Sequence, residues 1–581
     1  MLLGGLRDSN GGNVSLADVN SPDVTAMDYN TCVTVCGTEN EAFVWSDFVQ
    51  RVLEWLLPYL SLCSQLPFGA KYNTDNLMSI VLAAGSPALA GYTLFMTMLN
   101  TRWINKSFEA VKSFPNTAEA ARVLSSLQQV PVHVSDAECM LSSLVVLPEN
   151  DDWWFEFAES VIFLTLNYMK TWSISAAVSI TWVILAWIFT ATLFTLTSRS
   201  SFVNQSVGTM FLWLIPVVVG WQQLSPKCDY DRLSRAFDRS DAKAYVATHE
   251  GGKKAGLFTE ERAISIAPVV SEDAVSPDVF ATPPIFNYSR TFAWSRSAEE
   301  VLRAFQYASS NAAVHKPVNP ERTWEVLDDD DIHPDNRRGP PIEVERYCGR
   351  LDSRQSPWAS GVLTRVALAS IAGLVLQWGT TGPAIIMLLY TPTVGLACRS
   401  LSLLTYGLLS TMIWMMMLAS SVAAHYAISH HQDDYDPLFN HVHHIWKRAA
   451  DVFRLIGQVL AVLNSIIFFS IPVLEFANLF DNCYYDSSVL GLGRAGAYNV
   501  VTLLNSDEEV TKRVYALCMA AAALCAVAFV AVFNINTDWD FQPSNRSGRT
   551  LVDLVCSRTS PSSFAYIVTS EQSLNLFLVF A

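Results

Sequence analysis

The sequence predicts an all-α fold, a polytopic transmembrane helix bundle with a partly helical, irregular soluble insert. Hydrophobic residues make up 51% of the 581 residues and charged residues only 16%, and the mean hydropathy is positive. This composition departs from that of soluble domains toward that of membrane proteins. Several apolar segments also reach the roughly 20 residues needed to cross a hydrocarbon core about 30 Å thick. A long polar stretch separates two groups of such segments.

The composition divides the chain into regions that we expect to differ in environment. In chain order these are a polar, largely disordered segment (1–51), membrane helices 1 to 4 (52–224) with a soluble loop (101–171), the soluble insert (225–360), membrane helices 5 to 8 (361–533) with a His-rich loop (428–454), and a C-terminal tail (534–581).

The clear membrane segments are apolar runs with almost no charge, namely 76–100, 172–196, 400–427, 455–479 and 514–533. Segment 207–224 is shorter but uncharged, and 361–390 is long and contains glycine and proline. Segment 52–68 is marginal because it is short and carries Glu54 and Pro58. Counting this segment gives about eight spans, and omitting it gives seven.

The distribution of basic residues predicts an orientation. With eight spans both termini lie on one side, together with the loop 101–171 and the insert 225–360. Lys and Arg near the membrane are more numerous on that side, so the positive-inside rule places the termini and the long loops in the cytosol. The lipid bilayer is the expected partner, in either the plasma membrane or an endomembrane. The net charge of −16 and the scattered basic residues exclude nucleic acid.

The longest apolar segment contains LQWGTTGPAIIMLLYTP. One helix of about 30 residues would be about 45 Å long, which exceeds the hydrocarbon thickness. Pro383 removes a backbone donor, so we expect a break or kink between Gln377 and Pro383. In one interpretation a second half-helix directs free N–H groups and the hydroxyls of Thr380 and Thr381 at an anionic substrate. In the other, the proline only kinks the helix.

Three polar residues lie within segment 455–479, two of them near its end. Asn464, Glu475 and Asn478 are separated by eleven and three residues, which places them on one face of a helix. A carboxylate within a membrane segment predicts ion coupling or a proton relay. The alternative is that all three are hydrogen-bond partners between helices.

Histidines are concentrated in HYAISHHQDDYDPLFNHVHHIW. Imidazole and carboxylate are ligands for transition metals, and His441 and His444 share a face if the residues after Pro437 are helical. The spacing is irregular and no HExxH motif occurs, so a solvated or pH-sensitive loop is the alternative. The acidic run 328–331 lacks calcium-loop spacing and is interpreted as a solvated surface. We therefore assign no metal site and no cofactor.

Eleven cysteines are spread over the chain, several of them within apolar runs, which excludes a disulfide scaffold. Cys398 and Cys483 fall in predicted loops on the same side of the membrane, where they could form a disulfide. Cys32 and Cys36 form a single pair with no second pair, which does not predict a zinc site.

Long motifs in the chain resemble those of uncharacterised multi-pass membrane proteins of filamentous fungi. The motifs are SQLPFGA, GSPALAGY, SSLQQVPV, VVLPENDDWW, KTWSISAAVSITWVI, SPKCDYDRL, AYVAT, IHPDNRRG, LQWGTTGPAIIMLLYTP, LACRS and SSVLGLGRAGAYNV, which together extend roughly over residues 31–533. The resemblance implies a fungal origin and a shared membrane fold, and it carries no activity. The His-rich stretch departs from the family pattern, which makes a general metal function less expected.

No nucleophile elbow, P-loop, dinucleotide fingerprint or kinase motif occurs, so no catalytic residue is assigned. We expect a transporter-like or channel-like membrane protein that uses Thr380 and Thr381 for the substrate and Asn464, Glu475 and Asn478 along the path. A membrane scaffold or sensor that binds a protein partner through the 225–360 insert is the alternative. A membrane-bound metal-dependent enzyme is a second alternative.

Overall fold

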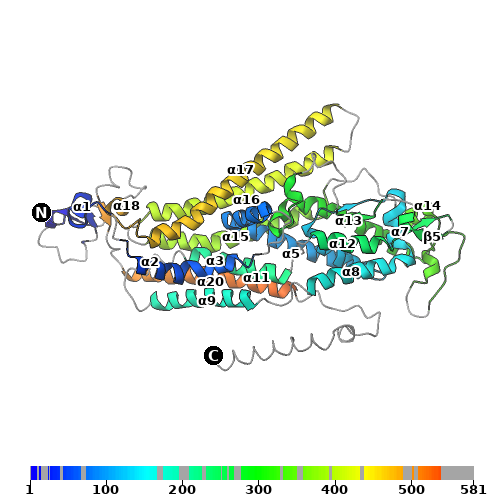
Figure 1. Ribbon diagram of the computed structural model, residues 1–581, viewed down its shortest axis with the longest axis horizontal. Helices are drawn as coiled ribbons and strands as arrows, with labels where there is room; N and C mark the ends of the chain where they lie inside the picture. Colours follow the sequence, from blue (N-terminus) through cyan, green and yellow to red (C-terminus); the bar gives the residue numbers. More distant parts are fainter. Residues whose placement is uncertain are drawn as a thin grey trace, which may run out of the picture. The chain divides into compact units, whose positions relative to one another are not determined.

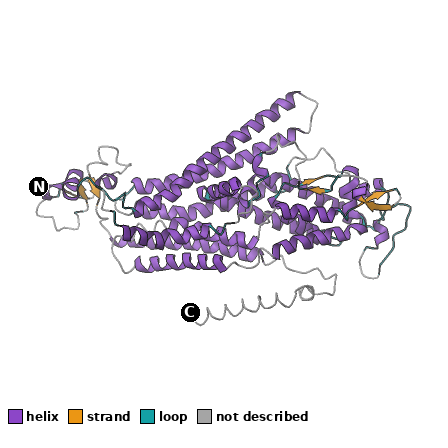
Figure 2. Cartoon of the chain, viewed as in Figure 1, coloured by secondary structure: helices purple, strands orange, loops and turns teal. Residues whose placement is uncertain are grey.

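The computed structural model describes residues 2–8, 12–14, 24, 26–39, 43–66, 73–166, 174–194, 208–224, 230–249, 251–257, 261–266, 276–327, 332–349, 358–390, 395–431, 437–487, 500–502 and 508–537. The chain forms two compact units, Met1–Asn536 and Thr537–Ala581, and the described elements lie in the first apart from Thr537, the last residue of α20. Helices make up most of the described chain and the strands are short (Figure 2), which confirms the helical fold class. The acidic run 328–331 lies outside the described residues, as does nearly all of the predicted tail.

A helix bundle surrounds the larger hydrophobic core. Its helices are α2 (Trp45–Arg51), α3 (Leu57–Cys63), α4 (Asn73–Gly85), α5 (Pro87–Glu109), α9 (Ile174–Phe194), α11 (Leu214–Leu224), α15 (Val362–Leu389), α16 (Cys398–His431), α17 (Pro437–Phe476) and α20 (Glu508–Thr537). The longest two, α16 and α17, pack against each other along much of their length (Figure 1). The apolar runs of the sequence supply most of these helices, so the core follows from composition.

The prediction of eight membrane spans is not supported. Among the described residues, four helices are long and apolar enough to cross a membrane, namely Val362–Leu389, Cys398–Ile428, Val442–Phe476 and Lys512–Ile535. The pair α4 and α5 would be a fifth only if a bend of 107° were counted as one span. The other expected segments are shorter in the described chain, or are interrupted, as 52–68 is by the π-helical turn η3 (Val52–Leu56).

The predicted loop 101–171 and the insert 225–360 form one lobe. Both contribute to a second hydrophobic core, in which Trp154 and Phe305 contact each other edge to face. The lobe contains α6 (Thr117–Ser126), α7 (Met140–Val146), α8 (Asp151–Leu166), α12 (Tyr230–Asp241), α13 (Asn287–Ala313), α14 (Pro341–Tyr347), β3 (His133–Val134), β4 (Tyr245–Thr248), β5 (Gly251–Lys254) and β6 (Ile264–Ser265). Strands β3 and β6 pair antiparallel across these two segments, with His133 opposite Ser265.

Helix α13 connects the lobe to the bundle. Its first turns place Tyr288 and Phe292 in the bundle core, and from Trp294 onward its buried residues belong to the lobe core. We call the end of the bundle that contacts the lobe the lobe end. Short helical turns complete this part of the chain and the rest: η1 (Leu2–Gly5), η4 (Leu127–Gln129), η5 (Ala137–Cys139), η6 (Pro148–Asn150), η7 (Phe211–Trp213), η8 (Ala255–Leu257), η10 (Pro277–Val279), η11 (Pro284–Phe286) and η12 (Pro334–Arg337).

An N-terminal cap joins segments that are far apart in the sequence. Strands β1 (Leu6–Arg7), β2 (Ala26–Asp28) and β7 (Val500–Thr502) form an antiparallel sheet in the order β1-β2-β7. Helices α1 (Tyr29–Cys36) and α18 (Cys483–Ser487) are linked by a disulfide between Cys32 and Cys483. We call the end of the bundle next to this cap the cap end.

The cap corrects two expectations. Cys483 pairs with Cys32, 451 positions away, and Cys398 is a free thiol, so the predicted Cys398–Cys483 pair is wrong. Described residues of segment 1–51 contribute helices and strands to the cap. The segment is also held beside the loop after α17, whereas the eight-span prediction put the two on opposite sides of the membrane. The sheet and the disulfide are long-range pairings, for which the local sequence pattern holds no signal.

Candidate functional site

The predicted break in LQWGTTGPA is absent. Helix α15 is continuous from Val362 to Leu389 with Pro383 inside it. The Thr380 hydroxyl donates to the carbonyls of Leu376 and Gln377 in its own helix, at 2.9 and 3.2 Å. Thr380 and Thr381 are both fully buried. Proline is tolerated within such helices because neighbouring groups compensate for the lost hydrogen bond, so this stretch does not present free N–H groups to a substrate.

The break lies instead between α4 and α5, at Ser86. Gly85 ends α4, the Ser86 side chain accepts a hydrogen bond from the Leu89 N–H, and Pro87 is the first residue of α5. Glycine at a helix end, serine as an N-cap and proline at the first helical position are the residues that these positions favour. The chain turns by 107° at this point.

Contacts along both helices show that the pair forms a V. Near the start of α4, Asp75 lies within electrostatic range of Asp278 in η10 and of Arg454 in α17, two residues that pair with each other toward the lobe end. Ten residues later, the Gly85 carbonyl accepts a hydrogen bond from Asn464. Helix α4 therefore runs from the lobe end into the bundle.

Helix α5 returns to the lobe end. Gly91 packs on Gly373 of α15 so closely that a Cβ on Gly91 would lie 3.0 Å from the Gly373 Cα. Farther along, the Asn100 side chain accepts a hydrogen bond of 2.9 Å from Arg365, near the start of α15. Both open ends of the V therefore face the lobe, and Ser86 lies at its point inside the bundle.

Side chains from three other helices bind the backbone at the point of the V. Tyr406 of α16 donates to the Ala84 carbonyl at 3.0 Å, and Asn464 of α17 donates to the Gly85 carbonyl at 2.7 Å. Gln377 of α15 accepts from the Ala88 N–H at 3.2 Å. These bonds replace the intrahelical partners that the break removes, which is the condition for irregular backbone inside a membrane.

The same side chains form a buried polar network, which we call the V network. The Gln377 amide donates to the Gly407 carbonyl at 2.7 Å and to the Thr411 hydroxyl at 3.0 Å. The Ser410 hydroxyl donates to Gln377 and lies 3.2 Å from the Ser86 hydroxyl. The network offers hydroxyl, amide and carbonyl groups without a charged side chain, so it is suited to polar or weakly charged solutes.

Two of the predicted site residues lie in or beside the V network. Asn464 also donates to the Tyr406 carbonyl at 3.0 Å, whereas its Oδ1 is buried without a hydrogen-bond partner among the described residues. Thr381 lies one turn beyond Gln377 and faces Gly407, and its hydroxyl is likewise buried without such a partner. Buried unpaired acceptors of this kind are uncommon in native proteins.

Glu475 and Asn478 belong to a separate cluster at the cap end. Arg399 of α16 pairs with Glu475 at 3.3 Å, and also with Asp481 and, at 3.8 Å, with Asp486. Asn478 accepts a hydrogen bond of 2.9 Å from Arg51. Eleven residues of helix separate Glu475 from Asn464, which is about 16 Å. The structure therefore does not bring all five predicted site residues together.

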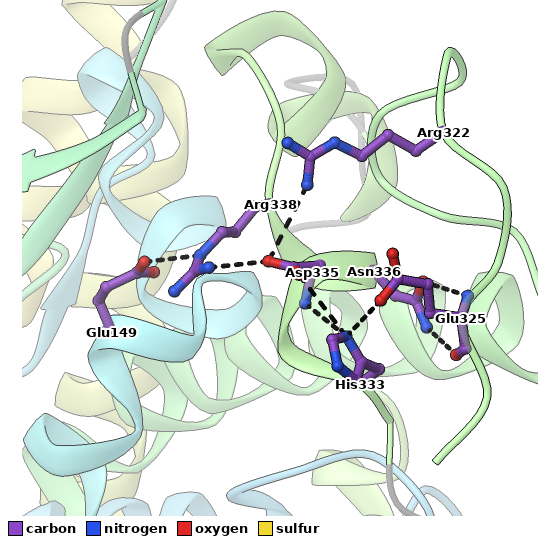
Figure 3. Close-up of polar contacts among 7 residues, drawn as sticks. All are labelled: Glu149, Arg322, Glu325, His333, Asp335, Asn336 and Arg338. Atoms are coloured by element: carbon purple, nitrogen blue, oxygen red, sulfur yellow. Dashed lines mark hydrogen bonds and ion pairs between the residues drawn. The ribbon is translucent and has the colours of Figure 1, made fainter.

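A charged cluster on the lobe is the second candidate site (Figure 3). His333 Nδ1 lies 3.1 Å from a Glu325 carboxylate oxygen and 3.9 Å from an Asp335 oxygen. These three groups could hold a divalent cation. Arg338, however, bridges Asp335 and Glu149 at 2.8 Å each. Partial burial opposes the charge of Arg338, yet the two carboxylates outweigh it and raise its pKa. Asp335 is therefore already neutralised in part.

The His-rich stretch does not form a described metal site. His443 is buried, with its Nδ1 2.8 Å from the Ala427 carbonyl, and His444 is exposed. His425 is buried with its ring against Phe292. The side chains of His430, His431 and His441 lie outside the described residues.

The sequence analysis missed Ser86, Gln377, Tyr406 and Ser410. The triplet Gly85-Ser86-Pro87 carried a usable signal, because it combines a helix stop, an N-cap and a helix start within three residues. The partners on α15 and α16 carried no such signal, since the sequence does not indicate which residues a polar side chain in an apolar helix contacts. Comparison of the chain with protein-family models, curated proteins and solved structures found no match.

Proposed function

We propose that the protein is an integral membrane protein whose bundle crosses the bilayer seven times and holds the V as a re-entrant helix pair. Four crossings are the long apolar helices α15, α16, α17 and α20. The other three are the segment from α2 to α3, helix α9 and the segment ending in α11.

Side-chain contacts support the three shorter crossings. Arg51 of α2 contacts the cap end, and the chain reaches the lobe end by Asp75. In α9, Trp187 packs beside Met387, near the cap end of α15. In α11, Gln223 is hydrogen-bonded to Asn534, near the lobe end of α20.

The disulfide supports this count independently. Cys32 and Cys483 must lie on the same side of the membrane, so the chain between them crosses an even number of times. The proposed topology gives six crossings between them, whereas counting the V as a span gives seven. Disulfides persist in oxidising compartments, which supports an orientation with the cap outside the cytosol and the lobe inside it. The lobe side is also the side that the positive-inside rule assigns to the cytosol.

We further propose a transporter-like function, with the V network as the position where a polar solute binds. The point of the V carries this proposal, because discontinuous helices that meet inside a bundle form the binding sites of many transporters. The unpaired acceptors of Asn464 and Thr381 supply groups that a solute can hydrogen-bond. The described conformation, in which the network is buried, corresponds to a closed state.

Cysteine labelling tests the proposal. The free cysteines are replaced while Cys32 and Cys483 are kept, and single cysteines are introduced by Ser86→Cys and Thr411→Cys. A membrane-impermeant maleimide applied from each side should label at least one of the two positions. Ala369→Cys is the matched control, because Ala369 is fully buried in α15 away from the V network and should not react. Absence of labelling at both test positions in folded protein would refute the transport proposal.

A scaffold or sensor function through the lobe is the second candidate. Large apolar side chains are exposed on the lobe, including Tyr307, Val314, Val326 and Ile342. A photo-crosslinker at Ile342 should then capture a partner in cells, whereas one at the exposed polar position Arg346 on the same helix should capture less. Unlabelled V positions together with crosslinks specific to Ile342 would favour this candidate over transport.

A further inference from the structure

The cap contains three cysteines at one place. The Sγ atoms of Cys32, Cys36 and Cys483 all lie within 4.8 Å of one another. Cys32 and Cys483 form the disulfide, whereas Cys36 is exposed and free. A free thiol this close to a disulfide is near enough to attack it by thiol–disulfide exchange.

The secondary structure explains why Cys36 is in position. Cys32 and Cys36 are four residues apart in α1, and residues with this spacing share a helix face. Both sulfurs therefore point toward Cys483, the first residue of α18. Cys36 is the last residue of α1, and Gly37 ends the helix with a φ of 84°, which leaves the thiol at an open helix end.

We propose that these residues form a redox site with two alternative disulfide pairings. The Cys36 thiolate attacks the Sγ of Cys483, the Cys36–Cys483 bond forms and the Cys32–Cys483 bond breaks. Cys32 leaves as a thiolate and takes up the proton that Cys36 lost. The number of disulfides is unchanged, so the step needs no external oxidant or reductant.

The exchange is coupled to the cap sheet. When the disulfide moves from Cys32 to Cys36, the position on α1 that is bonded to Cys483 moves by four helical residues, or about 6 Å. Strand β2 directly precedes α1, and its Met27 pairs with Val501 of β7. A shift of α1 toward the second pairing therefore strains this register, so the sheet favours the Cys32 pairing and the exchanged form loosens the sheet.

The redox site also connects to the bundle. Asp486 lies on α18, three residues after Cys483, and pairs with Arg399 at 3.8 Å. Arg399 in turn pairs with Glu475 at the end of α17. The pairing state of the cysteines can thus act on the ends of α16 and α17 through a chain of charged contacts.

The test uses the full-length protein with a protease site inserted at residues 351–357. After cleavage, a disulfide from the cap to α18 holds the two fragments together on a non-reducing denaturing gel. Wild type and Cys36→Ser should remain linked. Cys32→Ser should also remain linked, through Cys36 and Cys483, and Cys32→Ser/Cys36→Ser should separate. A Cys32→Ser protein that is monodisperse in detergent but separates after cleavage would overturn the proposal.

A second measurement covers the case in which Cys32→Ser does not fold. Wild-type protein is incubated without added thiol, quenched with acid and digested for peptide mapping. Peptides that link Cys36 to Cys483 should appear beside those that link Cys32 to Cys483, and Cys398→Ser should give the same result. Detection of the Cys32–Cys483 peptides alone would overturn the proposal.

Discussion

Replacing Gln377 by leucine should destabilise the bundle, mainly because it leaves the backbone N–H of Ala88 without an acceptor. The Gln377 side chain accepts from the Ala88 N–H and donates to Gly407 and Thr411. The Gly407 carbonyl and the Thr411 hydroxyl keep each other as partners at 3.0 Å, and Ser410 keeps Ser86. The Ala88 N–H has no other acceptor among the described residues. Leucine has a similar size, so the cavity contribution is small.

The expected loss of stability follows from these hydrogen bonds. An unsatisfied buried N–H costs about 1–3 kcal/mol, and each hydrogen bond lost between membrane helices costs about 0.6 kcal/mol. Gln377→Leu should therefore lower the free energy of unfolding by roughly 2–4 kcal/mol. Ser410→Ala removes a hydroxyl whose partners keep other bonds, and should cost about 1 kcal/mol or less.

Reversible unfolding in mixed detergent micelles measures both values. Val375→Ala is the control for α15, because Val375 is half exposed and its truncation should leave the unfolding curve almost unchanged. If Gln377→Leu costs no more than Ser410→Ala, then Gln377 does not hold the first turn of α5, and the assignment of the V network is wrong.

Three further predictions concern single positions. Gly373→Ala should cost about 1–3 kcal/mol, because its Cβ would lie 2.5 Å from the Ala88 carbonyl oxygen, whereas Gly382→Ala in the same helix meets nothing within 4 Å and should be neutral in the same unfolding assay. Burial raises the pKa of Asp241 to about 6, so the folded state binds this proton more tightly and stability falls as the pH rises from about 4 to about 6. Asp241→Asn should remove this loss, at most about 3 kcal/mol, in unfolding curves recorded across that range. Titration with Mn²⁺ should show weak binding that His333→Ala abolishes, and equal binding by both proteins would exclude a cation at that cluster.

The sequence predicted the helical class because apolar composition alone requires it. It placed the expected break at Pro383, whereas the helix break lies at Pro87. Pro383 follows Gly382 in a helix that continues, while Pro87 follows a serine that caps a new helix. The difference lies in the residue before the proline, since serine accepts the N–H groups of the next helix and glycine does not. Capping residues were therefore a better guide than the position of the proline.

The polar residues of α17 show where sequence reasoning stops. The helical period related Asn464, Glu475 and Asn478, but α17 ends at Phe476, before Asn478, and a shared face extends over the whole length of a helix. Asn464 lies beside the point of the V, whereas Glu475 lies at the cap end against Arg399. The two residues therefore serve different contacts, which only the partner helices determine. Three carboxylates surround Arg399. The sequence alone does not indicate that they would pair with this arginine.

The V, the disulfide and the charge distribution constrain one another. With the three shorter crossings of the proposed topology, a V that crossed the membrane would put Cys32 and Cys483 on opposite sides, where they could not pair. If the cap lay in the cytosol, the disulfide would stand in a reducing compartment and the lobe would lie outside. A re-entrant V, an extracytosolic cap and a cytosolic lobe satisfy all three conditions together. Under the proposed transport function, solutes reach the point of the V only when α16 and α17 move. These helices also hold Arg399 and Glu475, so the redox state of the cap is the first place to look for control of access.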